Sequence, residues 1–156
     1  MRQRPSKISP PEIYVQNAQR KFRVDVGSLQ EFSQCALSLC LRVRSGPELK
    51  RLPREVFILL ISDRRMAGLH RQFLNQTGPT DVITFQHGEI FVSIPTAQRQ
   101  ARQFGTSLSR EIQLYIVHGL LHLRGFDDQS ESDARKMHAL QSKIVVAALR
   151  LLAGEA

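Results

Sequence analysis

The chain has 156 residues with 42% hydrophobic content, a formal net charge of +8 and a pI near 10.3. This length suits one domain with a sizeable hydrophobic core, and the apolar content is close to the globular average. No apolar run is long enough to span a membrane, and the basic N-terminal residues lack the apolar stretch of a secretory signal. We therefore expect a cytoplasmic protein without a membrane partner, and the basic charge favours an anionic partner, nucleic acid above all.

The positive charge is concentrated at the start of the chain. Residues 1–54 contain eleven lysines or arginines against four acidic residues. Such an excess is typical of an ordinary solvated surface, or of a patch that follows a phosphate backbone. Composition alone leaves both interpretations open.

In the first third of the chain a strand and a helix follow an irregular segment. Residues 1–11 contain three prolines and no periodic pattern, so we expect a flexible tail before a single domain over 12–156. Alternating apolar residues predict a strand over 12–16. Apolar residues at three- and four-residue spacing predict a helix over 28–43, with Ser28 as its N-cap.

The middle of the chain predicts three further strands and one helix. Residues 55–62 (EVFILLIS) are an apolar run with β-branched members, which indicates a central strand buried on both faces. A helix capped by Asp63 follows and runs to about residue 74. Residues 81–85 and 89–93 predict a hairpin, because their three-residue link ends in glycine.

The rest of the chain is predicted to be helical. Pro95 begins a helix that ends near residue 103, and either Ser107 or Ser109 caps the next helix. A last helix spans about 131–152. This order of elements predicts an α+β fold, with a small mixed four-stranded sheet and about five helices.

The run HGLLHLRGFDD at residues 118–128 points to a metal site on the helix before the last. His118 and His122 are four residues apart, so on a helix their side chains share one face. Gly125 can adopt the left-handed conformation that ends a helix, and the chain can then return Asp128 to the histidines. Two histidines and one carboxylate leave a fourth ligand position open, as in catalytic zinc sites.

Alternatives to this interpretation exist for each residue. A histidine on an apolar helix face is often part of the core, but two buried imidazoles without partners would cost free energy that a metal would offset. Asp127 competes with Asp128 for the role of third ligand, or could hydrogen-bond a ligating histidine. Both acids could also simply favour the N-terminus of the last helix. Zinc, one ion per chain, suits the donor set best, and iron(II) uses the same donors.

The residue after the first histidine excludes one familiar mechanism. Zinc peptidases with an HExxH motif use the glutamate as general base. Here that position is Gly119. Proteolysis by that mechanism is therefore not expected.

Two motifs resemble those of a known family. Residues 118–127 are similar to the HGxLHLxGYD signature of the YbeY family, and residues 79–85 (PTDVITF) are similar to its PTDVLSF block. Residues 88–90 then resemble its GDI. The resemblance covers roughly residues 55–145. It implies a metal-dependent endoribonuclease involved in ribosomal RNA maturation and ribosome quality control.

The sequence departs from the family pattern at two places. The family's usual third ligand is a histidine where this chain has Asp128, which would make the site more negative and its metal a weaker Lewis acid. The family commonly has an arginine where this chain has Leu74. Arg71, one turn earlier, either replaces it as a catalytic residue or is an ordinary surface residue. Thr80 and Asp81 either shape a pocket beside the metal or form a turn before the strand.

The resemblance and the residues together predict a single metallohydrolase domain. We expect a single-strand-specific endoribonuclease that acts on ribosomal RNA of the small ribosomal subunit, with a zinc-activated water as nucleophile. The basic N-terminal third would hold RNA through its phosphates. The alternative is a ribosome-assembly or RNA-binding factor whose zinc site is structural or weakly active. The missing arginine at position 74 motivates this alternative.

Overall fold

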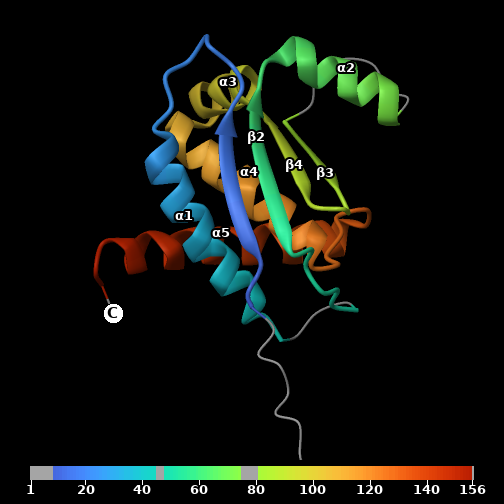
Figure 1. Cartoon of the computed structure of the whole chain (residues 1–156), viewed down its shortest axis with the longest axis vertical. Coiled ribbons are helices and arrows are strands. Elements are labelled where there is room, and N and C mark those ends of the chain that lie inside the picture. The colour runs from blue at the N-terminus through green and yellow to red at the C-terminus, as the bar shows by residue number, and fades with distance from the viewer. Residues whose placement is uncertain (1–8, 45–47, 75–80, 156) are drawn as a thin grey trace, which may run out of the picture.

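The structure, a computed structural model, describes residues 9–44, 48–74 and 81–155. Within them, four strands and five helices follow one another in the order that the sequence predicts (Figure 1). The α+β prediction is therefore confirmed. Most of the predicted tail lies outside the described residues. The elements are β1 (Glu12–Asn17), α1 (Val26–Leu41), β2 (Glu55–Ile61), α2 (Asp63–Leu74), β3 (Val82–Phe85), β4 (Glu89–Ser93), α3 (Ile94–Phe104), α4 (Leu108–Leu123) and α5 (Glu131–Leu152).

The four strands form one mixed sheet in the order β1-β2-β4-β3. β2 is parallel to both β1 and β4, while β3 and β4 form an antiparallel hairpin. The predicted central position of β2 is correct. Its alternate residues Val56, Ile58 and Leu60 are fully buried on one face, and Ile61 is fully buried on the other.

Helices cover the two faces of the sheet unequally. On one face, α1 and α4 pack against the strands, and α5 packs against both helices (Figure 1). The main hydrophobic core lies in this layer. On the other face, α2 forms a smaller cluster with β2 and the hairpin, in which Met66 meets Ile83 and Phe91. No helix in the described part of the chain is long and apolar enough to cross a membrane.

Two predicted helix caps are wrong. α1 begins two residues before Ser28, because the Asp25 carboxylate accepts a hydrogen bond from the Ser28 backbone amide at 3.0 Å and is the N-cap. At α2, the Ser62 hydroxyl accepts from the Arg65 amide at 3.2 Å, which places Asp63 in the first turn instead of at the cap. Of the two serines predicted for α4, Ser107 is the cap.

Two glycines set the position of α4, the helix that carries both histidines. A Cβ atom on Gly119 would lie 2.7 Å from the Ile90 side chain, so the glycine lets α4 pack closely on β4. Gly125 has φ +104°, and a Cβ there would lie 2.5 Å from the Glu48 carbonyl oxygen. The amides of Gly125 and Phe126 return to the carbonyls of His122 and Leu121, which is a Schellman ending. The chain therefore reverses just after the histidines.

Candidate metal centre

The two histidines of α4 face each other at close range. Their Nε2 atoms are 2.9 Å apart. The Nδ1 atom of His118 lies 2.9 Å from the Gln141 side-chain oxygen, and that of His122 lies 3.0 Å from the Phe126 carbonyl oxygen. Because both partners are acceptors, each Nδ1 carries a proton and donates. The lone pairs of both Nε2 atoms therefore point at one place, where only a shared proton or a cation relieves their repulsion.

Asp128 completes this group of donors. One carboxylate oxygen lies 3.6 Å from His118 Nε2 and the other lies 3.9 Å from His122 Nε2. One donor atom from each of the three residues lies within 4.8 Å of the others. Asp127, the competing candidate, instead accepts a hydrogen bond from the Gln129 amide at 3.3 Å. Among the described residues, the reversal at Gly125 thus brings Asp128 to the two histidines.

The electrostatic environment keeps His122 in the form that binds metals. Burial, and next the nearby His118, lower the pKa of His122 below its ordinary value, and the charge of Asp128 only partly opposes this. A neutral imidazole has the free lone pair that a metal needs. Asp128 is the only carboxylate in the group, and its side chain is 45% exposed. Two neutral nitrogens, one carboxylate and access from solvent fit a zinc or iron(II) ion with an open ligand position.

Gln141 on α5 contacts the candidate site, and the motif did not reveal it. Its side chain is 6% exposed and holds the His118 ring through the Nδ1 contact. The sequence does contain a signal, since Gln141 lies four residues after Met137 and three before Ile144, on the buried face of α5. A polar residue within an apolar stripe needs a polar partner, and here that partner is a candidate metal ligand.

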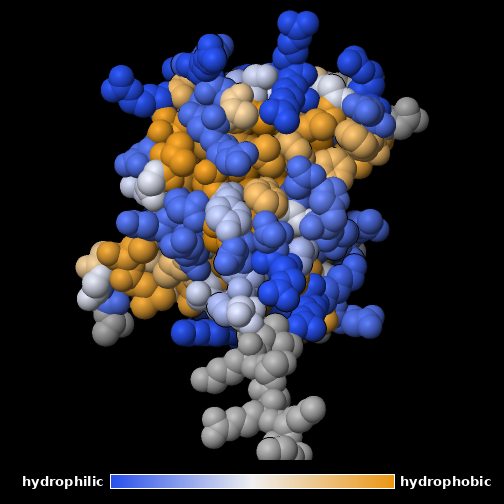
Figure 2. Space-filling model, viewed as in Figure 1, coloured by the Kyte–Doolittle hydropathy of each residue, from blue (hydrophilic) through white to orange (hydrophobic). Residues whose placement is uncertain are grey.

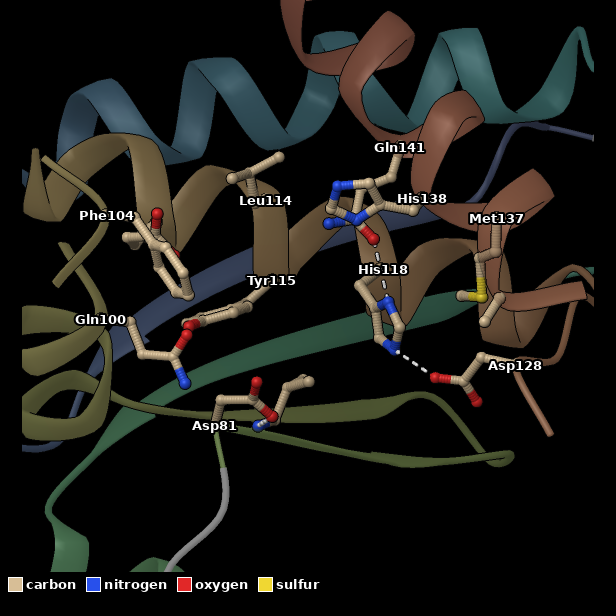
Figure 3. Close-up of a pocket in the computed structure, with 13 residues that line it drawn as sticks. Asp81, Gln100, Phe104, Leu114, Tyr115, His118, Asp128, Met137, His138 and Gln141 are labelled. Atoms are coloured by element: carbon tan, nitrogen blue, oxygen red, sulfur yellow. Dashed lines mark hydrogen bonds and ion pairs between the residues drawn. The ribbon is translucent and has the colours of Figure 1, made fainter. Parts of the chain in front are cut away.

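Two cavities lie beside His118, and some of the remaining predicted residues line them. The larger, about 530 Å³, has Asp81, His118 and Asp128 in its wall (Figure 3). The smaller, about 240 Å³, has both histidines and Leu74 in its wall. Arg71 is exposed on the last turn of α2 and lines neither cavity. Thr80 lies outside the described residues.

Tyr115 lies deep in the wall of the larger cavity. The residue is 7% exposed, and its hydroxyl is buried next to the Glu111 carboxylate. Burial, followed by the charges of Asp81 and Glu111, raises the pKa of Tyr115. The phenol is therefore protonated at neutral pH and can donate a hydrogen bond.

The basic residues of the N-terminal third that the structure describes do not gather in one place. One group, 20–23, follows β1, and the other, 42–54, precedes β2. Because β1 and β2 are parallel, these groups lie at opposite ends of the sheet. Figure 2 shows hydrophilic residues at both ends of this face and a hydrophobic band across part of the face between them. The second group lies beside the end of α4, where Arg124 donates to the carbonyls of Lys50 and Val43.

The fold and the donor group define this chain as an α+β protein with a cluster of two histidines on α4 and one aspartate from the segment after that helix. A sequence profile described as "Endoribonuclease YbeY" matches residues 14–148. This match covers most of the chain. The chain belongs to the YbeY family.

Individual relatives agree with this assignment. "Endoribonuclease YbeY" of Anaeromyxobacter sp. (strain Fw109-5) is 35% identical over 117 residues, which are 67% of this chain and 61% of that protein. The protein of the same name from Pelotomaculum thermopropionicum is 30% identical over 148 residues, 85% of this chain and 94% of the relative. The solution structure of TM1509 from Thermotoga maritima superposes with a TM-score of 0.62 at 26% identity, over 91% of this chain and 92% of that one.

Proposed function

We propose that this chain is a metal-dependent endoribonuclease that cleaves single-stranded RNA during maturation of small-subunit ribosomal RNA and in ribosome quality control. The observation that carries the proposal is the meeting of His118, His122 and Asp128, with both imidazole Nδ1 atoms already engaged. The name of the matched family supports RNA as the substrate. The net charge of +8 suits a polyanionic substrate.

We further propose that one zinc ion per chain is held by the two Nε2 atoms and the Asp128 carboxylate. When bound, zinc would supply a Lewis acid that lowers the pKa of a water ligand and neutralises charge on a phosphate. Iron(II) is compatible with the same donors. Gln141 and the Phe126 carbonyl fix the two rings, so little reorganisation would accompany metal binding. The cavities on either side of His118 leave room for an RNA strand to cross the site.

Metal content tests the ligand set. Protein purified without added metal is analysed for zinc and iron, and we expect about one zinc ion per chain. Asp128→Ala should lose most of it, because a ligand is removed. Asp127→Ala is the matched control and should retain it. Equal metal content in wild type and Asp128→Ala would reject Asp128 as a ligand, and no metal in any of the three would reject the metal site.

Cleavage of ribosomal RNA fragments tests the activity. We expect metal-loaded wild type to cut single-stranded segments, and His118→Ala to cut at least about a hundredfold more slowly because the metal is lost. RNA binding by the variant should fall much less than cleavage, since most phosphate contacts would be made by basic residues outside the metal centre. Variants at His118 and His122 that support ribosome maturation as well as wild type would overturn the enzyme proposal.

One observation favours a second candidate function, an RNA-binding ribosome-assembly factor with a structural or weakly active zinc site. Leu74, where the family resemblance predicts an arginine, is 48% exposed and lines the smaller cavity beside both histidines. No cation from this position can therefore stabilise a phosphate there. Leu74→Arg separates the two candidates, with the equally exposed Leu151→Arg as control. A rise in cleavage of about tenfold or more in Leu74→Arg alone supports a nuclease limited by this position. A wild type and a Leu74→Arg variant that both bind but never cut RNA favour the assembly factor.

A further inference from the structure

The end of α2 and the β3–β4 hairpin bring three aromatic rings together near the metal centre. The Phe85 ring on β3 stacks with the His87 ring of the hairpin turn at a centroid distance of 5.7 Å. The Phe73 ring on α2 meets the Phe85 ring edge-on at 5.3 Å. Figure 1 shows α2 and β3 on the same side of the molecule, away from α1. We refer to Phe73, Phe85 and His87 as the aromatic shelf.

The two outer rings of the aromatic shelf are open to solvent. Phe73 is 54% exposed, and the His87 side chain is 66% exposed although one face of its ring lies against Phe85. The Glu89 carboxylate contacts His87 through Nε2, an atom on the edge of the ring, so this contact leaves the outer face free. Phe85 packs against the hydrophobic cluster under α2, whereas Phe73 and His87 do not belong to it. Packing of the core therefore does not account for the outer rings.

The aromatic shelf is continuous with the metal centre. The smaller cavity, about 240 Å³, has Phe85 in its wall together with His118 and His122. All four residues of β3 line this cavity, so it follows the strand. β3 is the last strand of the sheet, and β4 is its one neighbour among the described strands. An RNA strand with a phosphate at the histidines would therefore pass the shelf as it leaves the cavity along β3.

The charge of α2 suits a polyanion beside the shelf. The helix carries three exposed arginines, Arg64, Arg65 and Arg71. Asp63, the only acidic residue of α2, is paired with Arg99 at 2.8 Å. Exposed aromatic rings beside basic side chains are typical of surfaces that bind single-stranded nucleic acid, because bases stack on the rings and phosphates meet the cations. An acidic protein segment would meet the same charges, but the continuity with the metal centre favours RNA.

We propose that the aromatic shelf stacks unpaired bases of the RNA strand on one side of the scissile phosphate. This inference rests on the proposed nuclease function and names residues that restrict its substrate to single strands. One base stacks on the outer face of His87 and extends the stack of His87 on Phe85, and a second base stacks on Phe73. Bases inside a duplex are already paired and stacked on one another, so they cannot reach these rings. Every base has a face that can stack, and the shelf therefore accepts any of them.

The chain contains no tryptophan, so a single introduced tryptophan can report on the shelf. Phe73→Trp places it there, and the control Tyr14→Trp places it at the opposite edge of the sheet, where Tyr14 stacks on Phe57. Metal-loaded protein is mixed with a single-stranded oligouridylate, and fluorescence is recorded by stopped flow before cleavage proceeds. We expect quenching in Phe73→Trp, because a base lies on the indole, and none in Tyr14→Trp. No quenching in Phe73→Trp at saturating RNA would overturn the proposal and leave a protein as the occupant of the shelf.

Affinity measurements separate base stacking from phosphate contacts. Phe73→Ala and His87→Ala should each weaken binding of the oligouridylate by about fivefold or more at every salt concentration. The slope of log K against log salt should stay as in wild type, because no phosphate contact is lost. An oligomer of equal length without bases should bind wild type and both variants equally, and Tyr14→Ala is the control that should bind both oligomers as wild type does. Unchanged affinity for the oligouridylate in both variants, or an equal loss for the oligomer without bases, would reject stacking.

These measurements are independent of cleavage. A protein whose Phe73→Trp fluorescence is quenched by RNA but that never cuts RNA would retain the shelf and reject the nuclease. A protein that cuts RNA with metal but shows no quenching in Phe73→Trp would retain the nuclease and reject the shelf.

Discussion

At the scale of single residues, the donor group depends on a side chain outside the motif. Gln141 holds His118 from another helix, while a backbone carbonyl holds His122. A backbone acceptor persists after any substitution at Phe126, but the Gln141 acceptor can be removed. His118 is therefore the ligand whose orientation can be tested separately.

We expect Gln141→Met to weaken zinc binding by about tenfold or more, because the His118 ring loses the acceptor that fixes its tautomer and orientation. Chelator competition measures the change, and far-UV circular dichroism checks that the fold is retained. Gln34→Met, on the exposed face of α1, is the control and should not alter the affinity. An unchanged zinc affinity in Gln141→Met would mean that the contact does not orient His118.

At the scale of elements, the close approach of α4 to β4 determines where the histidines stand. The approach depends on Gly119, and Ile90 opposite it is fully buried. A side chain at this position would have to displace the core. Packing thus explains the glycine of the motif, because the glutamate of an HExxH motif would not fit at this position either.

We expect Gly119→Ala to lower the free energy of unfolding by about 1–3 kcal/mol, because the new methyl group overlaps the Ile90 side chain. Gly68→Ala on α2 is the matched control. It meets nothing within 4 Å, so the higher helix propensity of alanine should stabilise the protein by roughly 0.5–1 kcal/mol. Urea unfolding measures both. The same sign for both variants would contradict the packing argument.

Helices α2 and α3 are joined by one carboxylate. Asp63 on α2 accepts hydrogen bonds from three side chains of the β4–α3 segment: Ser93, Thr96 and Arg99. Partial burial acts to raise the pKa of Asp63, but these hydrogen bonds, that of Arg99 first, outweigh it and lower the pKa below its model-compound value of 3.8. The stabilisation is therefore fully present above about pH 3.8 and is lost as the pH falls through the lower folded value.

Asp63→Asn should lower stability at neutral pH by about 1 kcal/mol, a modest value because solvent reaches the site. It should also flatten the fall in stability of the wild type below pH 4, since the titrating group is gone. Urea unfolding at a series of pH values measures this dependence. Identical slopes in the acid range for both proteins would show that the contacts to Asp63 do not contribute to acid unfolding.

At the scale of the whole molecule, the two basic groups differ in their distance from the metal centre. The group at 42–54 adjoins the end of α4, and the group at 20–23 lies at the far end of the sheet. An RNA strand with a phosphate at the histidines would touch the 42–54 group more readily than the 20–23 group. The two groups should therefore contribute unequally to RNA binding.

We expect Arg51→Gln with Arg54→Gln to weaken RNA binding and to reduce the slope of log K against log salt by about 0.7 for each lost phosphate contact. Arg20→Gln with Lys21→Gln removes the same charge at the opposite end and should change the slope less. Fluorescence anisotropy with a single-stranded RNA between low and moderate salt measures both. Equal slopes for the two double variants, or a wild-type affinity independent of salt, would argue against this interpretation.

The sequence by itself determined the order of the elements, the mixed sheet and the helix that carries His118 and His122. These features depend on local patterns: the period of apolar residues, the i and i+4 spacing, and the turn residues Gly88 and Gly125. The two wrong caps lie where two polar residues close together in the sequence could each cap the helix. Ser28 and Asp63 each stand close to a residue, Asp25 or Ser62, that is better placed to accept.

Only the tertiary structure decided which groups meet across elements. It brought Gln141 to His118, placed Leu74 beside the histidines, separated the basic residues into two groups and surrounded Tyr115 with carboxylates. Such contacts depend on how the helices pack on the sheet. No periodic pattern in the intervening sequence predicts which residues will be in contact. The position of Asp128 depends partly on the local sequence and partly on the tertiary structure. Its place after Gly125 is local, but its preference over Asp127 depends on the three-dimensional course of the reversal.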